Sequence, residues 1–401
     1  MVSQFYRKLS ITVVALVTLL HLASFATTPK SLPEGRTHQM AEQARREPVL
    51  GSSTRPYEDL LNHRAGFAKD VTGGAGGEVV VIDSLNYKNL KDALESDGPK
   101  WIRFKPGLKG EIEIEGHLYI KSDKTIDGRG ADITLTSPDD CDEIRFWGRE
   151  KRNHSIEVNR SNLIVHNIKI IRIGAGDNCG QGIGIAFDAR NVWIDHVTFS
   201  HNGDESVSMG KGATDLTVSW CRFVDTDKGI LLSWGDKGDD ALDGVIKATI
   251  HHCYFLRVNG RSPFLTYGRA HYFNNYNKDW NWGAVHSTMG AEVYSENNIY
   301  GGGRWNNSPP AIDTISNRWR PKPGYAKTVG DVFLNIPDGI DARGPGINTG
   351  KVFNPGEFYE YKAEPADDRL KDKLEKYAGW SEDPQWPEDD EPLGKERERT
   401  N

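Results

Sequence analysis

Asn191-Val-Trp-Ile-Asp-His-Val-Thr-Phe199, Asp215-Leu-Thr-Val-Ser-Trp-Cys-Arg-Phe223 and Lys247-Ala-Thr-Ile-His-His-Cys-Tyr-Phe255 are three versions of one short phrase. Related phrases precede and follow them, and the six units begin 22 to 32 residues apart, at Asn162, Asn191, Asp215, Lys247, Arg269 and Glu292. Repeats of this length indicate a solenoid. The β-branched and aromatic bias favours strands, and the periodic leucines and regular helix of a leucine-rich repeat are absent. We therefore predict an all-β fold, a single-stranded right-handed parallel β-helix.

The repeat register predicts which side chains stack on one another, because neighbouring parallel strands lie about 4.8 Å apart. The second position of each unit should form an inward column, made of Leu163, Val192, Leu216, Ala248, Ala270 and Val293. The seventh position places Cys221 beside Cys253, and Asn275 beside Asn298. Stacked asparagines can ladder amide to amide.

The four cysteines after the N-terminal segment show no Cys-x-x-Cys spacing, which argues against a zinc site. In-line stacking is poor geometry for a disulfide, so we expect Cys221 and Cys253 to remain a pair of buried thiols. Cys141 and Cys179 are the better candidates for a bridge, which an exported protein could form.

The two ends of the 401-residue chain differ in composition from its middle. Residues 1–26 combine a cationic start, an apolar run and a small-x-small cleavage site, which predicts a signal peptide and a secreted protein that has no membrane segment after cleavage. We assign residues 27–60 to a linker or N-terminal arm, 61–349 to the β-helix, and 350–401 to a C-terminal wrapping segment with a charged tail. The net charge of -7 argues against a nucleic-acid partner.

Three charged residues lie nearly the same distance downstream of the three phrases. Asp204, Lys228 and Arg261 follow the first residue of their phrases by 13, 13 and 14 residues. On a solenoid, equal offsets place side chains in one column along one face. Such a column would suit an anionic sugar chain lying in a groove, and it would equally suit a ladder of salt bridges on a solvated face.

Many short motifs of the chain resemble, in order, those of the pectate lyase/pectin lyase superfamily, polysaccharide lyase family 1. The resemblance covers roughly residues 66 to 300. The upstream motifs are Gly66-Phe67, Gly73-Gly74, Trp101-Ile-x-Phe104 and Lys124-Thr-Ile-Asp-Gly-Arg-Gly130. The downstream motifs are Asn191-Val-Trp-Ile-Asp-His196, Thr217-Val-Ser-Trp-Cys221, Asp227-Lys228, His251-His252, Arg261-x-Pro263, Gly268, His271 and Asn274-Asn275.

The resemblance implies roles for individual residues. Arg261 matches the family's catalytic arginine, which removes the C5 proton of a uronic acid residue before β-elimination. Lys228 matches a lysine that binds the substrate carboxylate and raises the local positive potential. The implied partner is an acidic polysaccharide such as polygalacturonate, bound by a monomer. Beside these residues, the rings of Trp280 and Trp282 could stack on sugar faces or pack at the surface.

The implied calcium site departs from the family pattern. Its ligand positions fall on Asp204, Ser208 and Gln181, where the family has carboxylates. Calcium takes six to eight oxygens and its affinity follows ligand charge, so one carboxylate and two neutral groups make a weak site. Glu205, Asp177 and the acidic loop 236–240 are further oxygen donors nearby in the sequence.

Two arginine positions of the family pattern are also replaced, by Phe264 and Thr266. We predict a secreted lyase that cleaves a pectate-type polysaccharide by β-elimination with calcium as cofactor. A calcium-independent lyase of pectin or another uronan is the first alternative. A non-catalytic carbohydrate-binding β-helix is the second. A glycoside hydrolase would need paired carboxylates, whereas the column contains one acid and two cations.

Overall fold

The computed structural model describes residues 56–137, 144–147, 161–175, 179–235, 239–302, 310–317, 319–336 and 341–387. All of them belong to one compact unit, Thr54–Asn401. The predicted signal peptide and nearly all of the predicted N-terminal arm lie outside the described residues, as does Cys141.

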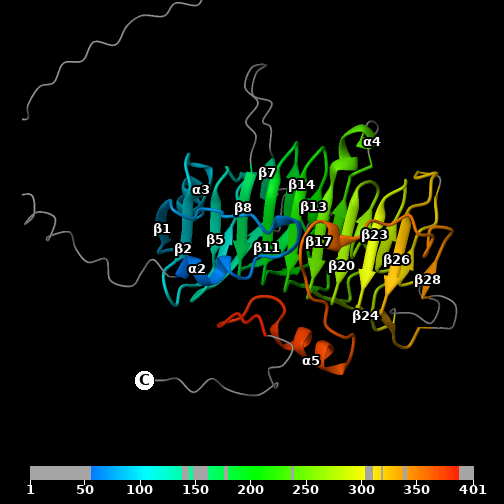
Figure 1. The fold of residues 1–401 in the computed structure, drawn as a ribbon. Helices are drawn as coiled ribbons and strands as arrows, with labels where there is room; N and C mark the ends of the chain where they lie inside the picture. The colour runs from blue at the N-terminus through cyan, green and yellow to red at the C-terminus, as the bar shows by residue number, and fades with distance from the viewer. Residues whose placement is uncertain are drawn as a thin grey trace, which may run out of the picture. The chain divides into compact units, whose positions relative to one another are not determined.

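Three parallel β-sheets, named A, B and C here, make up this unit (Figure 1). Sheet A contains β1 Glu78–Ile82, β2 Lys100–Phe104, β5 Lys124–Asp127, β8 Ser161–His166, β11 Arg190–Asp195, β14 Thr214–Ser219, β17 Lys247–His251, β20 Arg269–Phe273, β23 Glu292–Glu296 and β26 Tyr325–Val329. Sheet B contains β3 Lys109–Glu113, β6 Asp132–Ser137, β9 Lys169–Ile173, β12 Thr198–Ser200, β15 Arg222–Val224, β18 Tyr254–Leu256, β21 Tyr276–Lys278, β24 Ile299–Tyr300 and β27 Val332–Phe333. Sheet C contains β4 Leu118–Tyr119, β7 Ile144–Trp147, β10 Ile183–Ala186, β13 Glu205–Met209, β16 Lys228–Leu232, β19 Phe264–Leu265, β22 Val285–Ser287, β25 Ile312–Asp313 and β28 Ala342–Arg343.

Successive coils of the chain visit sheets A, B and C in turn, and each strand pairs with the equivalent strands of the coils before and after it. This is the predicted right-handed parallel β-helix. The pairing register also confirms the inward column, because Val192 lies between Leu163 and Leu216, and Ala248 lies opposite Ala270.

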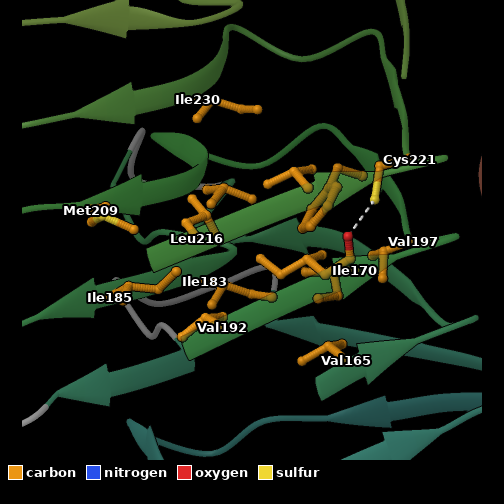
Figure 2. Packing of buried hydrophobic residues seen from close by; sticks show 14 of the residues in the cluster. Val165, Ile170, Ile183, Ile185, Val192, Val197, Met209, Leu216, Cys221 and Ile230 are labelled. Carbon is orange, nitrogen blue, oxygen red and sulfur yellow. Dashed lines mark hydrogen bonds between the residues drawn. The ribbon is translucent and has the colours of Figure 1, made fainter. Parts of the chain in front are cut away.

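The core lies between the three sheets and consists mainly of branched aliphatic side chains. Figure 2 shows it near the middle of the stack, where Val192 and Leu216 of sheet A face Ile183 and Ile185 of sheet C. All four side chains are fully buried. Burial of apolar area at this scale is the main favourable term for such a fold, and it holds the coils in one register.

The corner between sheets A and B is a regular turn of two residues. For example, β11 ends at Asp195 and β12 begins at Thr198. The first turn residue has a positive φ, between 49° and 55°, in six coils, at Asn167, His196, Trp220, His252, Asn274 and Asn297. Their rings stack where they are aromatic, with 4.6 Å between the centroids of Trp220 and His252. These histidines are therefore part of the scaffold.

The two predicted polar columns also follow the register. Cys221 and Cys253 are free, buried thiols, as predicted. Asn275 Nδ2 donates to Asn298 Oδ1 at 3.1 Å, which confirms the asparagine ladder. Cys179 is disulfide-bonded, and its predicted partner Cys141 lies outside the described residues.

The helices are short and lie outside the sheets. They are α2 Pro56–Leu61, α3 Tyr87–Glu95, α4 Asp239–Leu242 and α5 Asp368–Tyr377, with single 3-10 turns η1 Gly66–Ala68, η2 Asp243–Val245 and η3 Pro355–Glu357. In Figure 1, α5 (orange-red) lies alongside the stack. Its Leu370 and Leu374 pack against Trp220 of the corner and Tyr254 of β18. Among the described residues, no helix is long and apolar enough to span a membrane.

Candidate active site on sheet C

The three charged residues of the predicted column lie where successive coils enter sheet C. Asp204 directly precedes β13, Lys228 is the first residue of β16, and Arg261 lies shortly before β19. In the register, Lys228 stands between Glu205 and Gly260. The pairing is offset by one residue at each step, so the three residues do not form the straight column that was predicted. They still lie on successive coils, where Lys228 pairs with Asp204 and the charge of Asp204 acts on Arg261.

Each cation of the site is paired with a carboxylate from an earlier coil, one coil earlier for Lys228 and two coils earlier for Arg261. Lys228 Nζ donates to Asp204 Oδ1, and Arg261 Nη1 donates to Glu205 Oε1. The side chain of Glu205 is 2% exposed, whereas those of Asp204, Lys228 and Arg261 are 33%, 21% and 29% exposed. Two cations and one acid thus face solvent, and the second acid lies beneath them.

Glu205 has a different position from the one expected. The sequence suggested it only as an extra oxygen donor for a metal, whereas its carboxylate is the anchor of Arg261. Its place beside Asp204 at the start of β13 is the signal that could have identified this role, since strand alternation directs neighbouring side chains to different sides.

The environment of Arg261 acts on its charge in both directions. Burial lowers the pKa of Arg261 below its ordinary value, the charge of Arg320 acts in the same direction, and the charge of Asp204 opposes them. The ion pair with Glu205 also favours the protonated guanidinium. Arg261 therefore rests as a cation whose proton is held less firmly than that of an exposed arginine.

The oxygen atoms at the implied calcium positions satisfy one another or the chain's own cations. Ser208 Oγ donates to Gln181 Oε1 at 2.5 Å, and Ser208 is fully buried. The carboxylate of Asp204 is paired with Lys228. Asp177 lies outside the described residues. Calcium needs several anionic oxygens directed at one point, and the described donors do not fit that requirement.

A different group of metal-type ligands lies at the corner between sheets A and B. Within the described parts of the chain, His166, Asp195 and His196 are the one group of three whose ligand atoms lie within 4.8 Å of one another. All three are fully buried, and Asp195 accepts hydrogen bonds from both rings and from Ser219. His196 also contacts Gln385 O of the C-terminal segment at 2.9 Å. This network braces the corner away from sheet C.

The structure separates the two tryptophans that were expected near the substrate. Trp280 is 3% exposed and packs in the core against Tyr300. Its ring faces are therefore covered, and the prediction that it stacks on a sugar is wrong. Trp282 is 46% exposed. Its ring lies against Gly260, where an added Cβ would come within 3.1 Å, and this places Trp282 beside Arg261.

The outer face of sheet C beyond Arg261 carries the two positions where arginines of the family pattern are replaced. Phe264 stacks on His286, with 5.2 Å between the ring centroids. Thr266 accepts a hydrogen bond of 3.0 Å from Nε of Arg320, a residue of the loop after β25. Sequence reasoning missed Arg320, because it lies 54 residues after Thr266 and belongs to none of the repeated phrases.

Comparisons with known proteins identify the family and the fold of the chain. A family model described as "Pectate lyase" matches residues 59–379. A probable pectate lyase of Arabidopsis thaliana is 31% identical over 260 residues, which cover 59% of this chain and 53% of that protein. A pectate lyase of Emericella nidulans is 34% identical over 215 residues, which cover 51% of this chain and 57% of that protein. The chain therefore spans about half the length of these curated relatives.

Two solved structures resemble the fold. The crystal structure of Jun a 1, the major allergen from cedar pollen, has a TM-score of 0.67 and 22% identity, and the match covers 82% of this chain and 97% of that one. A pectate lyase from Bacillus sp. N165 in complex with trigalacturonate has a TM-score of 0.59 and 25% identity, covering 79% of this chain and 98% of that one. Both confirm the β-helix.

Proposed function

Since the chain belongs to the pectate lyase family, we propose that it is a lyase that cleaves an acidic, pectate-type polysaccharide by β-elimination. The observation that carries this proposal is the partly exposed pair Lys228 and Arg261 on adjacent coils of sheet C, each oriented by a carboxylate. We further propose that the protein is secreted, on the strength of residues 1–26, and that a single chain binds the polymer.

In the proposed reaction, Lys228 binds the carboxylate of the uronic acid residue whose C5–H bond breaks. Negative charge grows on that carboxylate as C5 loses its proton, and a fixed ammonium beside it stabilises the charge as it develops. Substrate binding requires Lys228 to turn from Asp204 toward the new carboxylate. The exchange keeps one anion beside the ammonium throughout, so the charge is never left without a partner.

Arg261 is the proposed base. It takes the C5 proton, the electrons form the C4–C5 double bond, the C4–O bond breaks, and the leaving oxygen takes up a proton. An arginine is protonated at ordinary pH, so the rate depends on the small neutral fraction. Burial and Arg320 enlarge that fraction. Glu205 orients the guanidinium of Arg261, although the negative charge of Glu205 reduces the neutral fraction of that guanidinium.

Calcium is implied by the family resemblance, yet the described donors do not fit a calcium site, and no step of this mechanism uses it. The cations of the chain itself stand where positive charge is needed. A calcium-independent lyase is therefore a second candidate, favoured by the pairing of Asp204 with Lys228 and of Gln181 with Ser208.

The test is to incubate the purified full chain with polygalacturonate or methyl-esterified pectin, each with added calcium or with a chelator. Unsaturated uronate product absorbs in the ultraviolet, and its appearance supports a lyase. New reducing ends without that absorbance would mean hydrolysis, and neither signal would mean binding only. Equal rates with calcium and with chelator would select the calcium-independent candidate.

A further inference from the structure

Arg320 reaches the outer face of sheet C from a coil that is remote in sequence. Its Nε donates to Thr266 Oγ1 at 3.0 Å, and its Nη2 donates to the carbonyl oxygen of Trp234 at 3.5 Å. Its guanidinium carbon lies 4.7 Å from the centroid of the Phe264 ring. The half-buried guanidinium is thus fixed on this surface by hydrogen bonds that it donates to two coils and by the face of the Phe264 ring.

The surroundings of Arg320 are shaped to admit it. An added Cβ at Gly235 would lie 3.1 Å from Arg320 Nη2 and 3.2 Å from Thr266 Cγ2. Gly235 also has a φ of +73°, which disfavours other residues. On the other side, Asn317 Oδ1 accepts from the backbone N–H of Arg320 at 2.9 Å, and the two backbones exchange hydrogen bonds. The loop is therefore tied at the point where the side chain leaves it.

Arg320 and Arg261 share one patch of surface. Their guanidinium carbons lie 4.7 Å and 6.0 Å from the centroid of the same Phe264 ring. The charge of Arg320 acts on Arg261 and lowers its pKa, and an anion bound between or beside the two guanidinium groups would relieve this repulsion. Lys228 lies on the coil before Arg261, and its partner Asp204 also acts on the charge of Arg261.

We propose that Arg320 binds a carboxylate of a uronic acid residue that neighbours the one held by Lys228 and Arg261. It would do so beside Thr266, which stands where the family pattern has an arginine. A later coil would thus supply the guanidinium that this position lacks. A guanidinium can bind a carboxylate through two parallel hydrogen bonds, whereas a methyl ester carries no charge to pair with it. Arg320 thereby selects unesterified residues. The inference rests on the proposed function only for the identity of the polymer.

The test measures binding of trigalacturonate and of its methyl-esterified form by calorimetry. All variants carry Arg261→Ala in the full chain, so that cleavage does not consume the ligand. Adding Arg320→Gln should weaken binding of the free acid by about 10- to 100-fold, the loss of one charge-assisted contact. Binding of the ester should change less than about twofold. The control Arg190→Gln removes an exposed arginine of sheet A and should leave both affinities unchanged.

A second variant separates lost recognition from lost folding. Thr266→Arg combined with Arg320→Gln returns a guanidinium to the same place and should recover most of the affinity, with an unchanged thermal midpoint. Unchanged binding in Arg320→Gln, an equal loss for acid and ester, or no binding of trigalacturonate to the Arg261→Ala parent would overturn the inference. In that case, unsaturated product from the native chain would leave the proposed function standing. A carboxylate-selective loss without any product would overturn the function and support the inference.

Discussion

Glu364 anchors the C-terminal segment to the corner between sheets A and B, and its removal should destabilise the fold by a predictable amount. Its carboxylate accepts hydrogen bonds from His252 Nε2 at 2.8 Å and from Lys373 Nζ at 2.5 Å. Its backbone exchanges two more with the Asn274 side chain, at 2.7 and 2.8 Å. The side chains of Glu364 and Lys373 are only 10% and 5% exposed. The charges are therefore poorly screened by solvent.

The pKa of Glu364 sets the magnitude. Burial opposes its charge, but the hydrogen bonds and charges of His252 and Lys373 outweigh burial and lower the pKa to about 2, from an ordinary 4.5. A carboxyl whose pKa is depressed in the folded state stabilises the fold above the unfolded pKa, and this contribution disappears as the pH falls from about 4.5 toward 2. The shift corresponds to about 3 kcal/mol at pH 7 and about half of that at pH 3.

The assay is urea unfolding of the native chain and of Glu364→Gln, which imitates the protonated acid, at pH 7 and at pH 3. The free energy of unfolding should fall by about 3 kcal/mol at pH 7 and by about 1.5 kcal/mol at pH 3. The control is Glu357→Gln in η3, where the side chain is exposed and a change of under about 0.5 kcal/mol is expected. A loss at pH 7 below about 1 kcal/mol, or an equal loss at both pH values, would refute the electrostatic reasoning.

Four further predictions concern other side chains. Trp282→Ala should raise KM about 3- to 10-fold, from lost ring stacking, and leave stability intact. Trp280→Ala should instead lower the free energy of unfolding by about 3–5 kcal/mol, measured with urea, because it opens a cavity in the core. If the two variants raised KM equally, Trp282 could not be distinguished from Trp280 as the residue that contacts the sugar, and its assignment would be wrong. Burial raises the pKa of Asp331 to about 6 from 3.8, so its contribution to stability is lost as the pH rises from about 3.8 to 6. Asp331→Asn should therefore raise the free energy of unfolding at pH 7 by about 1–3 kcal/mol. A destabilised variant would be the contrary result. Glu205→Gln removes the anion beside Arg261, so the ascending limb of the kcat profile, where the rate rises as the base loses its proton, should move to lower pH. An ascending limb that stays in place or moves to higher pH would count against Arg261 as the base.

The periodic parts of the molecule could be predicted from the sequence because one rule generates all of them. Once the phrases beginning at Asn191, Asp215 and Lys247 are set in register, parallel stacking dictates which residues are neighbours. The inward column, the thiol pair and the asparagine ladder follow directly from that rule. The same rule places Asp204, Lys228 and Arg261 on successive coils near the start of sheet C, but it misses the offset of one residue at each step.

The parts that could not be predicted depend on contacts the repeat does not encode. Glu205 is identified as the anchor of Arg261 only by the path of the two side chains across coils 56 residues apart. Trp280 and Trp282 are two residues apart, and only their backbone geometry decides which one is buried. Arg320 enters from an irregular loop, and the hydrogen bonds of Glu364 depend on how a non-repetitive segment crosses the corner.

Lys228 and Arg261, the partly exposed cations of sheet C, are proposed to catalyse an elimination. The most direct test is to digest trigalacturonate with the native chain in ¹⁸O-labelled water and to weigh the products by mass spectrometry. Elimination adds no water, so we predict an unsaturated fragment without ¹⁸O at the cleaved bond, and none of it from Arg261→Ala. Two saturated fragments with no unsaturated one, or undiminished product from Arg261→Ala, would contradict the account.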